Sequence, residues 1–283
     1  MTSTFLSKAL AASMTAINLA GGPTHSEAER RRIIEDVYNG KRPAHFTAPE
    51  VVADDPHLGA EDYVRECMAE LESAPPLFKS AFSHLSEGRL DKAASTFSGC
   101  LIAGGEGMTD EWAATAVCYA AYCVAELGDF EQAISMAEAA KKMGFLLNGG
   151  FYYYSAMFTA LNQLDKLDEA LRIAEEAVRF FLEHQSPGDV ASNLGRKANI
   201  LKQMASHLSR SPQPQRAQSV INEAVRAYCE SLMITMAGWG EQDVAELSAM
   251  GQIASRVGVR RRDLTFLDTM PKVDAMVGRF FAS

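Results

Sequence analysis

The sequence predicts an all-α protein, an α-α superhelix of stacked helical hairpins with an N-terminal helical extension and C-terminal capping helices. Apolar residues recur with the period of a helix, and no run of Val, Ile and Thr alternates as a half-buried strand would. Four similar segments also recur: GRLDKAASTF, GDFEQAISMA, DKLDEALRIA and PQRAQSVINEA. They share alanines at Ala93, Ala133, Ala170 and Ala217. Such recurrence is typical of helical hairpins that cover one another's apolar faces.

Three parts are expected along the chain, beginning with a helical extension over residues 1–73. Within it, residues 1–20 predict an amphipathic helix, and a weak secretory signal is the alternative. Polar residues interrupt the apolar run and Lys8 is its only basic residue, which disfavours a signal peptide. Ser26 is expected to cap a second helix, and the prolines of residues 40–58 predict an irregular connector before a helix at 60–71.

Residues 74–238 are predicted to form four hairpins. Turns are expected where Gly or Asp breaks the periodicity, at Gly88, Gly128 and Asp165, and at the proline-rich segment 211–214. Asp189 is expected to cap a helix after a Pro-Gly break. The first helices are Leu77–Glu87, Thr109–Leu127, Phe151–Leu164 and Asp189–Leu208, and the second helices are Arg89–Ile102, Phe130–Met143, Leu167–His184 and Gln215–Ala237.

Residues 239–283 are predicted to seal the end of the stack. Helices are expected over Glu241–Val257, Arg262–Leu267 and Pro271–Phe281. A terminal repeat needs one polar face because no further unit covers it. These helices are therefore interpreted as an imperfect fifth hairpin.

The hairpins resemble those of the tetratricopeptide-repeat family. The resemblance covers about residues 74–237. The spacing departs from the family's regular repeat, and the usual Trp and helix-ending proline are absent. The family's apolar offsets are filled by Leu77, Ala81, His84, Ala93, Phe97 and Cys100 in the first hairpin, Val117, Ala120, Ala121, Val124, Gly128, Ala133, Ala137 and Ala140 in the second, Tyr154, Met157, Phe158, Leu161, Ala170, Ala174 and Ala177 in the third, and Leu201, Met204, Ala205, Leu208, Ala217, Ile221 and Ala224 in the fourth.

This resemblance implies that outward residues of the first helices line a concave groove and contact a partner. The first hairpin offers an apolar anchor, whereas the others offer polar side chains suited to a peptide. Lys202 has no matching basic residue in the second and third hairpins, which disfavours the type of site that binds the carboxyl termini of chaperones. The positions are Phe78, Phe82 and Leu85, then Thr115, Cys118, Tyr122 and Glu126, then Tyr152, Ser155, Thr159, Asn162 and Gln163, then Asn199, Lys202, Ser206 and Arg210.

The densest aromatic cluster lies around the start of the third hairpin. Tyr154 and Phe158 share a helix face and are expected to pack between hairpins. Tyr152 is expected to be the most exposed member. The runs Arg30–Arg32 and Arg260–Arg262 are interpreted as solvated surface and helix-end contacts rather than phosphate sites.

Charge and cysteine usage narrow the function classes. The net charge is −9, with −6 in residues 1–110, −6 in 111–186 and +3 in 187–283. This acidic balance disfavours nucleic-acid and anionic-membrane binding, although the basic last third favours an acidic partner. The five cysteines form no CxxC pair, which predicts buried free thiols in a reducing, cytoplasmic compartment. No stretch is apolar enough to span a bilayer.

No motif predicts catalysis. The six histidines show no metal-ligand spacing, and the chain has no P-loop, no GxGxxG after a strand and no GxSxG. The Asp54-Asp55-His57 cluster is best explained as a solvated loop. We therefore expect no enzyme activity, no cofactor and no metal.

The predicted function is non-catalytic binding of a protein or peptide segment, as an adaptor, co-chaperone or regulator. One alternative is a regulator gated by a peptide signal, in which the N-terminal helices act on a second target. Another is a scaffold that self-assembles into a homo-oligomer.

Overall fold

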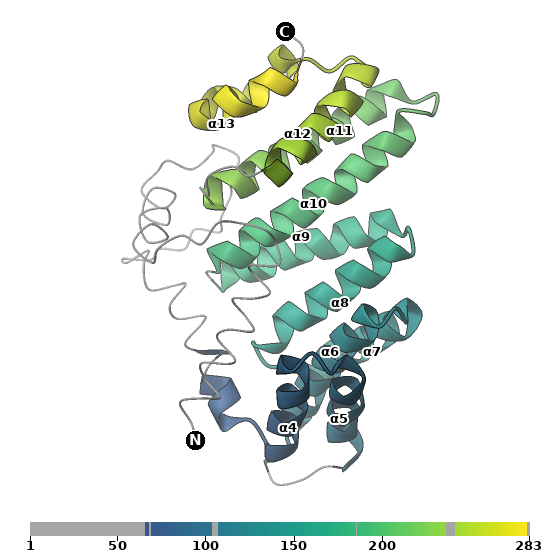
Figure 1. Ribbon diagram of the computed structural model, residues 1–283, viewed down its shortest axis with the longest axis vertical. Coiled ribbons are helices and arrows are strands. Elements are labelled where there is room, and N and C mark those ends of the chain that lie inside the picture. Colours follow the sequence, from purple (N-terminus) through teal and green to yellow (C-terminus); the bar gives the residue numbers. More distant parts are fainter. Residues whose placement is uncertain (1–65, 68, 104–106, 185, 236–240, 282–283) are drawn as a thin grey trace. The chain divides into compact units, whose positions relative to one another are not determined.

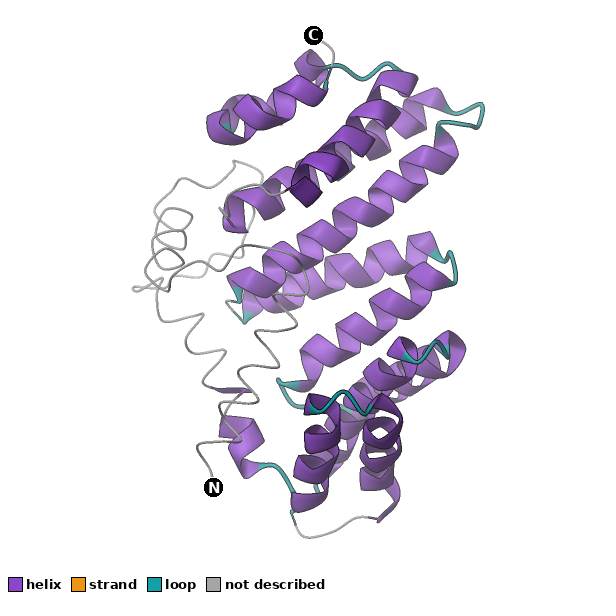
Figure 2. Cartoon of the chain, viewed as in Figure 1, coloured by secondary structure: helices purple, strands orange, loops and turns teal. Residues whose placement is uncertain are grey.

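Helices joined by short turns and loops make up the part of the chain that the computed structural model describes, which is residues 66–67, 69–103, 107–184, 186–235 and 241–281 (Figures 1 and 2). No strand occurs among these residues, so the all-α prediction is confirmed for them. The helices and connector expected within residues 1–65, with Arg30–Arg32 and Asp54-Asp55-His57, lie outside the described residues. None of the described helices is both long and apolar enough to cross a bilayer.

The bounds of the α-helices agree with the predicted bounds to within a few residues. Glu241–Val257 and Phe130–Met143 are found with the predicted bounds. The α-helices are α4 (Pro76–Ser86), α5 (Leu90–Ala103), α6 (Asp110–Glu126), α7 (Phe130–Met143), α8 (Gly149–Gln163), α9 (Leu167–Glu183), α10 (Pro187–Leu208), α11 (Pro214–Thr235), α12 (Glu241–Val257) and α13 (Pro271–Val277).

Contacts divide the described residues into two compact units. Unit 1 comprises the described residues up to Ile173 and unit 2 those from Ala174 onward, so the division falls within α9. In unit 1, α6 packs against α5, α7 and α8. In unit 2, α10 packs against α11, and both contact α12. The division at residues 73 and 238 and the continuous superhelix stay predictions.

Three hairpins end their first helix in the same way. Gly88, Gly128 and Asp165 have φ values of 73°, 92° and 56°. This left-handed conformation suits Gly and is tolerated by Asp. After each first helix, two backbone N–H groups reach back to its carbonyls, as from Gly88 to Leu85 and from Arg89 to His84. This is the Schellman arrangement, and it confirms the three predicted turns.

The recurring alanines mark where helices pack. Ala93, Ala133, Ala170 and Ala217 all have 0% exposure. Side chains of one carbon let neighbouring helices approach closely without leaving voids. The alanines therefore belong to the interior of each unit, as predicted.

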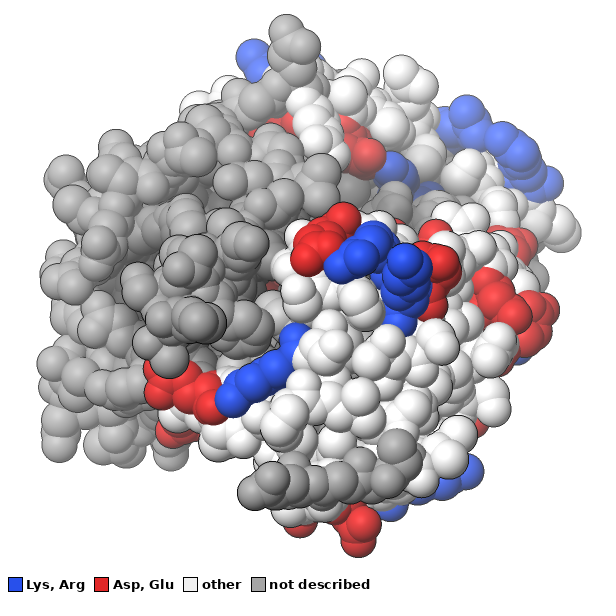
Figure 3. All heavy atoms as spheres, turned by 60° about the horizontal axis from the view of Figure 1, so that its bottom comes forward, with Lys and Arg blue, Asp and Glu red and all other residues white. Residues whose placement is uncertain are grey.

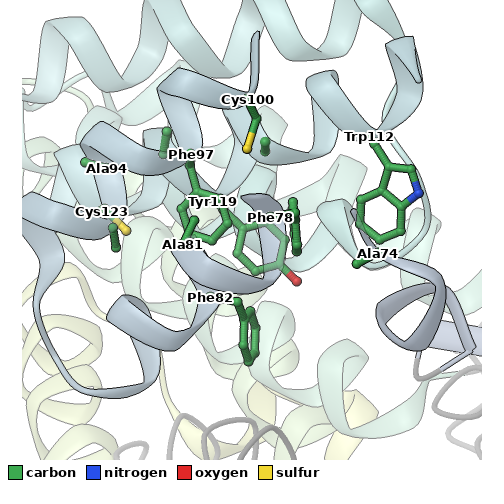
Figure 4. Close-up of a cluster of buried hydrophobic side chains, with 13 residues drawn as sticks. Ala74, Phe78, Ala81, Phe82, Ala94, Phe97, Cys100, Trp112, Tyr119 and Cys123 are labelled. Carbon is green, nitrogen blue, oxygen red and sulfur yellow. The ribbon is translucent and has the colours of Figure 1, made fainter. Parts of the chain in front are cut away.

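Phe78 lies at the centre of the unit 1 core (Figure 4). Its ring makes edge contacts with Phe97, Trp112 and Tyr119 at centroid distances of 5.1, 4.8 and 5.1 Å. Edge-to-face contacts of this kind stabilise beyond simple area burial. The cluster joins α4, α5 and α6.

The segment after α12 forms turns of 3₁₀ helix where an α-helix over Arg262–Leu267 was expected. η1 (Arg261–Asp263) and η2 (Thr265–Thr269) precede α13, and η3 (Gly278–Phe280) follows it. Short 3₁₀ turns are common as connectors between helices. The Arg261 guanidinium holds this segment together, because it donates to both Asp274 carboxylate oxygens, at 2.5 and 2.9 Å, and to Asp268 at 3.0 Å.

Asp189 is not the cap that was expected for α10. The helix begins at Pro187, with Ser186 before it, and Asp189 lies in the first turn. The Ser186 hydroxyl donates to the Asp189 carboxylate at 2.6 Å. Pro suits the first helical position because the missing N–H has no partner there anyway, so the helix starts earlier than Asp189 predicts.

We expect Gly251→Ala to destabilise unit 2. A Cβ at Gly251 in α12 would lie 2.4 Å from the Phe280 carbonyl oxygen, so the last helical turn must shift, at a cost of about 1–3 kcal/mol. Thermal and urea unfolding measure the change. Gly195→Ala is the matched control, because its Cβ would meet only Ser231 Oγ at 3.7 Å. Equal stability of the two variants would contradict the close packing.

Candidate partner-binding faces

The first helices of two successive hairpins, α6 and α8, lie side by side in unit 1. Tyr152 near the start of α8 stacks on Tyr119 of α6 with ring centroids 3.7 Å apart. Tyr122, one turn further along α6, meets the same ring edge-on at 5.4 Å. The structure therefore brings together two predicted site residues, Tyr122 and Tyr152.

Side chains distant in sequence hold the loop before α8. The Glu70 carboxylate accepts from the backbone N–H of Leu147 at 3.1 Å and of Asn148 at 2.8 Å. It also accepts from the Asn148 side-chain amide at 2.8 Å. On the other side, Thr115 Oγ1 accepts from the backbone N–H of Leu146 at 2.9 Å, and Tyr119 donates to Asn148 Oδ1 at 3.4 Å. A charged acceptor satisfying backbone donors in this way fixes where α8 begins.

The remaining unit 1 positions differ in exposure along the two helices. Glu126 at the end of α6 and Gln163 at the end of α8 are exposed. Thr159 and Asn162 are half-buried, as are Tyr122 and Tyr152. This face thus presents polar groups at the helix ends and aromatic edges beside the core.

Tyr152 is the most exposed of the three consecutive tyrosines, as predicted. Tyr153 and Tyr154 are buried, whereas Tyr152 is half-buried. Burial, with smaller contributions from Tyr122 and Cys123, raises the pKa of Tyr152 well above its ordinary value, although a hydrogen bond with Tyr119 opposes the shift. The phenol therefore stays protonated, and Tyr152 serves as a packed aromatic platform.

The prediction of an apolar anchor on the first hairpin is wrong for two of its residues. Phe78 and Phe82 are 0% and 4% exposed and belong to the core cluster. Phe82 also contacts Tyr119, with centroids 6.0 Å apart. Both rings are used in packing α4 against α5 and α6, so neither presents a surface to a partner. Three further predicted positions are also buried, namely Thr115, Cys118 and Ser155.

In unit 2 the predicted positions follow α10. Asn199, Lys202 and Ser206 are half-buried and Arg210 is exposed. The Lys202 ammonium forms an ion pair with Glu246 of α12. This contact fastens α12 to α10, so Lys202 serves the packing of the unit and is not a free cation.

A second lysine, missed by sequence reasoning, bridges two other helices of unit 2. Lys197 Nζ lies 3.0 Å from Glu175 in α9 and 2.8 Å from Glu223 in α11. Burial by itself lowers the pKa of Lys197, but hydrogen bonds to Glu223 and Glu175 outweigh it and raise the pKa overall. Glu230, also on α11, interacts electrostatically with Lys197, Arg226 and Glu223, and these groups form a charged cluster with Glu175. The only sequence signal for this cluster was the spacing of Glu223, Arg226 and Glu230 at i, i+3 and i+7 on one helix face.

Glu230 is the member of this cluster that titrates near neutral pH. Burial raises the pKa of Glu230 from 4.5 to about 7, although Arg226 and Lys197 oppose the shift. Glu223 adds to it through like-charge repulsion. The charge of unit 2 therefore changes in the neutral range at this position.

Four of the five cysteines are buried free thiols, as predicted. Cys100, Cys118, Cys123 and Cys229 are buried and none of them forms a disulfide. Burial raises the pKa of Cys100 to about 11 and of Cys123 to about 12, which keeps these thiols protonated and unreactive. In the described part of the chain, no three His, Cys, Asp or Glu side chains are grouped to hold a metal ion.

Basic and acidic side chains are interspersed on the face shown in Figure 3. Blue and red groups lie in neighbouring pairs near its centre, and most of the described atoms there belong to uncharged residues. A surface of this kind gives short-range polar contacts rather than a strong field of one sign.

Comparison with known proteins gives no relative: no protein-family model matches the chain, and no curated protein matches it significantly. The resemblance to tetratricopeptide repeats therefore stays a prediction from the sequence.

We expect Glu70→Ala to loosen the start of α8. Removing the carboxylate leaves three N–H donors of Leu147 and Asn148 without this acceptor, and the expected loss of stability is about 1–3 kcal/mol. Urea unfolding and proteolysis in the 144–148 loop measure this loss. Glu72→Ala, at an exposed site on the same segment, is the control. Equal effects of the two changes would contradict this role of Glu70.

We expect Glu230→Gln to flatten the pH dependence of stability. Because the pKa of Glu230 rises from 4.5 to about 7 on folding, the folded state holds this proton more tightly than the unfolded chain. The stability gained is complete below pH 4.5 and is lost as the pH rises through about 7. Gln cannot lose that proton.

The measurement is urea unfolding at about pH 5 and about pH 8.5. Between these values the wild type is expected to lose stability relative to Glu230→Gln, on the order of 1–3 kcal/mol. Glu183→Gln, at an exposed position of α9, should leave the wild-type dependence unchanged. Parallel curves for Glu230→Gln and the wild type would show that Glu230 titrates normally.

Proposed function

We propose that this protein binds a protein or peptide segment without catalysis, on the outward face of its first helices, as an adaptor or regulator related to tetratricopeptide-repeat proteins. The observation that supports this most directly is the pairing of α6 and α8 as neighbours with Tyr122 and Tyr152 in contact. In stacked hairpins, the first helices of successive hairpins form one continuous face, which suits an extended or helical ligand.

The chemistry of this face suits a peptide. Thr159, Asn162 and Gln163 offer hydroxyl and amide groups that pair with either backbone donors or acceptors. Tyr122 and Tyr152 offer ring surface at low cost in side-chain entropy, since both rings are already held by packing. Glu126 adds one carboxylate at the end of α6.

The frame that carries these side chains is rigid. Repeated Schellman turns end the first helices, and the loop before α8 is held by Glu70 and Thr115. A prearranged surface spends less of its contact free energy on ordering itself. A cytoplasmic location and the absence of catalysis are part of the same proposal.

The test compares two triple variants for capture of peptides from a random peptide display library. Glu126→Ala with Thr159→Ala and Gln163→Ala changes the proposed face, while Glu131→Ala with Glu138→Ala and Lys142→Ala changes exposed positions of α7. We expect the first variant to lose affinity for selected peptides by on the order of tenfold, and the second to keep it. Tyr122 and Tyr152 are left unchanged because they support the core.

Retention of every selected peptide by the first variant would contradict the proposed face. Loss of binding in both variants would point to a different surface, and thermal unfolding of each variant separates lost contacts from lost folding.

A further inference from the structure

One end of unit 2 carries exposed arginines with few acidic neighbours. The chain has no Asp or Glu between Asp189 and Glu223, and none between Glu246 and Asp263. The turn between α10 and α11 lies within the first of these stretches, and the end of α12 lies within the second.

Two hydrogen bonds bring these stretches together. Arg256 Nη1 in the last turn of α12 donates to Ser209 Oγ at the α10–α11 turn, at 3.3 Å. Gln218 Nε2 near the start of α11 donates to the Val257 carbonyl oxygen at 2.6 Å. The residues beside these four anchors therefore share one edge of the unit.

We define the arginine edge as the exposed arginines at this place: Arg210, Arg216, Arg256 and Arg260. Among the described residues, none of the four forms an ion pair through its side chain. Asp263 is the nearest carboxylate in sequence, and it accepts from the backbone N–H of Arg260 at 2.8 Å. These four guanidinium groups thus have no carboxylate partner among the described residues, and Arg256 uses one N–H for Ser209.

Helix stability accounts for Arg256, which suits the last turn of α12, but it does not account for Arg216. Arg216 stands in the first turn of α11, where the helix dipole disfavours a cation, and that turn holds no acidic residue. By contrast, three half-buried cations of unit 2, Lys197, Lys202 and Arg261, are paired with carboxylates. A local arrangement that opposes helix stability without a compensating contact is expected at functional sites.

We propose that the arginine edge binds an acidic peptide segment of a partner protein. Guanidinium groups pair with the planar carboxylates of Asp and Glu through two parallel hydrogen bonds. A short acidic segment contacts this edge alone, whereas a long polyanion such as nucleic acid also experiences the net charge of −9 of the whole chain. The charge distribution therefore favours a peptide over nucleic acid.

The test uses a fluorescein-labelled oligoglutamate peptide of about ten residues, titrated with the full chain at low and moderate salt. The altered protein is Arg216→Gln with Arg256→Gln and Arg260→Gln. The control is Lys142→Gln with Arg172→Gln and Arg179→Gln, which removes as many exposed positive charges elsewhere. Fluorescence anisotropy reports binding, and thermal unfolding confirms that both variants fold.

We expect the wild type and the control to bind the peptide with an affinity that falls as salt rises. The arginine-edge variant should bind on the order of tenfold more weakly. Because these arginines lie outside the face of α6 and α8, the variant Glu126→Ala with Thr159→Ala and Gln163→Ala should bind oligoglutamate like the wild type. The proposal therefore succeeds or fails independently of the proposed function.

Several results would overturn the proposal. These are no binding by the wild type, equal weakening in the control, or tighter binding of an oligothymidylate of the same length. Light scattering could also overturn it. If the wild type self-associates in a salt-sensitive way and the arginine-edge variant does not, the edge binds a second copy of this chain.

Discussion

Helix α6 is the element on which unit 1 depends. Every residue from Trp112 to Ala121 is buried, because α5, α7 and α8 pack around it. Small side chains such as Ala114, Ala116 and Ala120 leave room for three neighbours at close range. A helix apolar on all sides is stable in water only when it is covered in this way. The positions of α5, α7 and α8, and hence of the candidate face, follow from this requirement.

Polar contacts select the register between helices that packing on alanines leaves open. Alanine surfaces permit close approach but offer little to select one register over another, and long-range hydrogen bonds supply that selection. Glu70 and Thr115, which both come earlier in the chain, accept hydrogen bonds from the backbone of the loop before α8. They set the position of Tyr152 against Tyr119 and Tyr122. Packing and polar contacts together thus determine the side chains that a partner would meet.

Among the cations of unit 2, one group is paired and another is exposed. Lys197, Lys202 and Arg261 join helices through carboxylates and have little exposed surface. The arginine edge consists of exposed cations that hold no two elements together by ion pairs. Paired charges that lose a partner leave a partly buried charge behind, whereas exposed arginines can be changed at little cost. This difference separates residues needed for folding from those available for recognition.

The sequence by itself determined the helices and most of their ends, because periodicity, Gly and Pro act over a few neighbouring residues. Gly88 and Asp165 predicted their turns from local backbone preference alone. Only the tertiary structure decided which residues face outward. Phe78 and Phe82 are buried, Lys202 is paired with Glu246, and Arg261 binds Asp274. Each of these outcomes depends on a neighbour distant in sequence or on another helix, and residue type and helical offset carry no information about that neighbour.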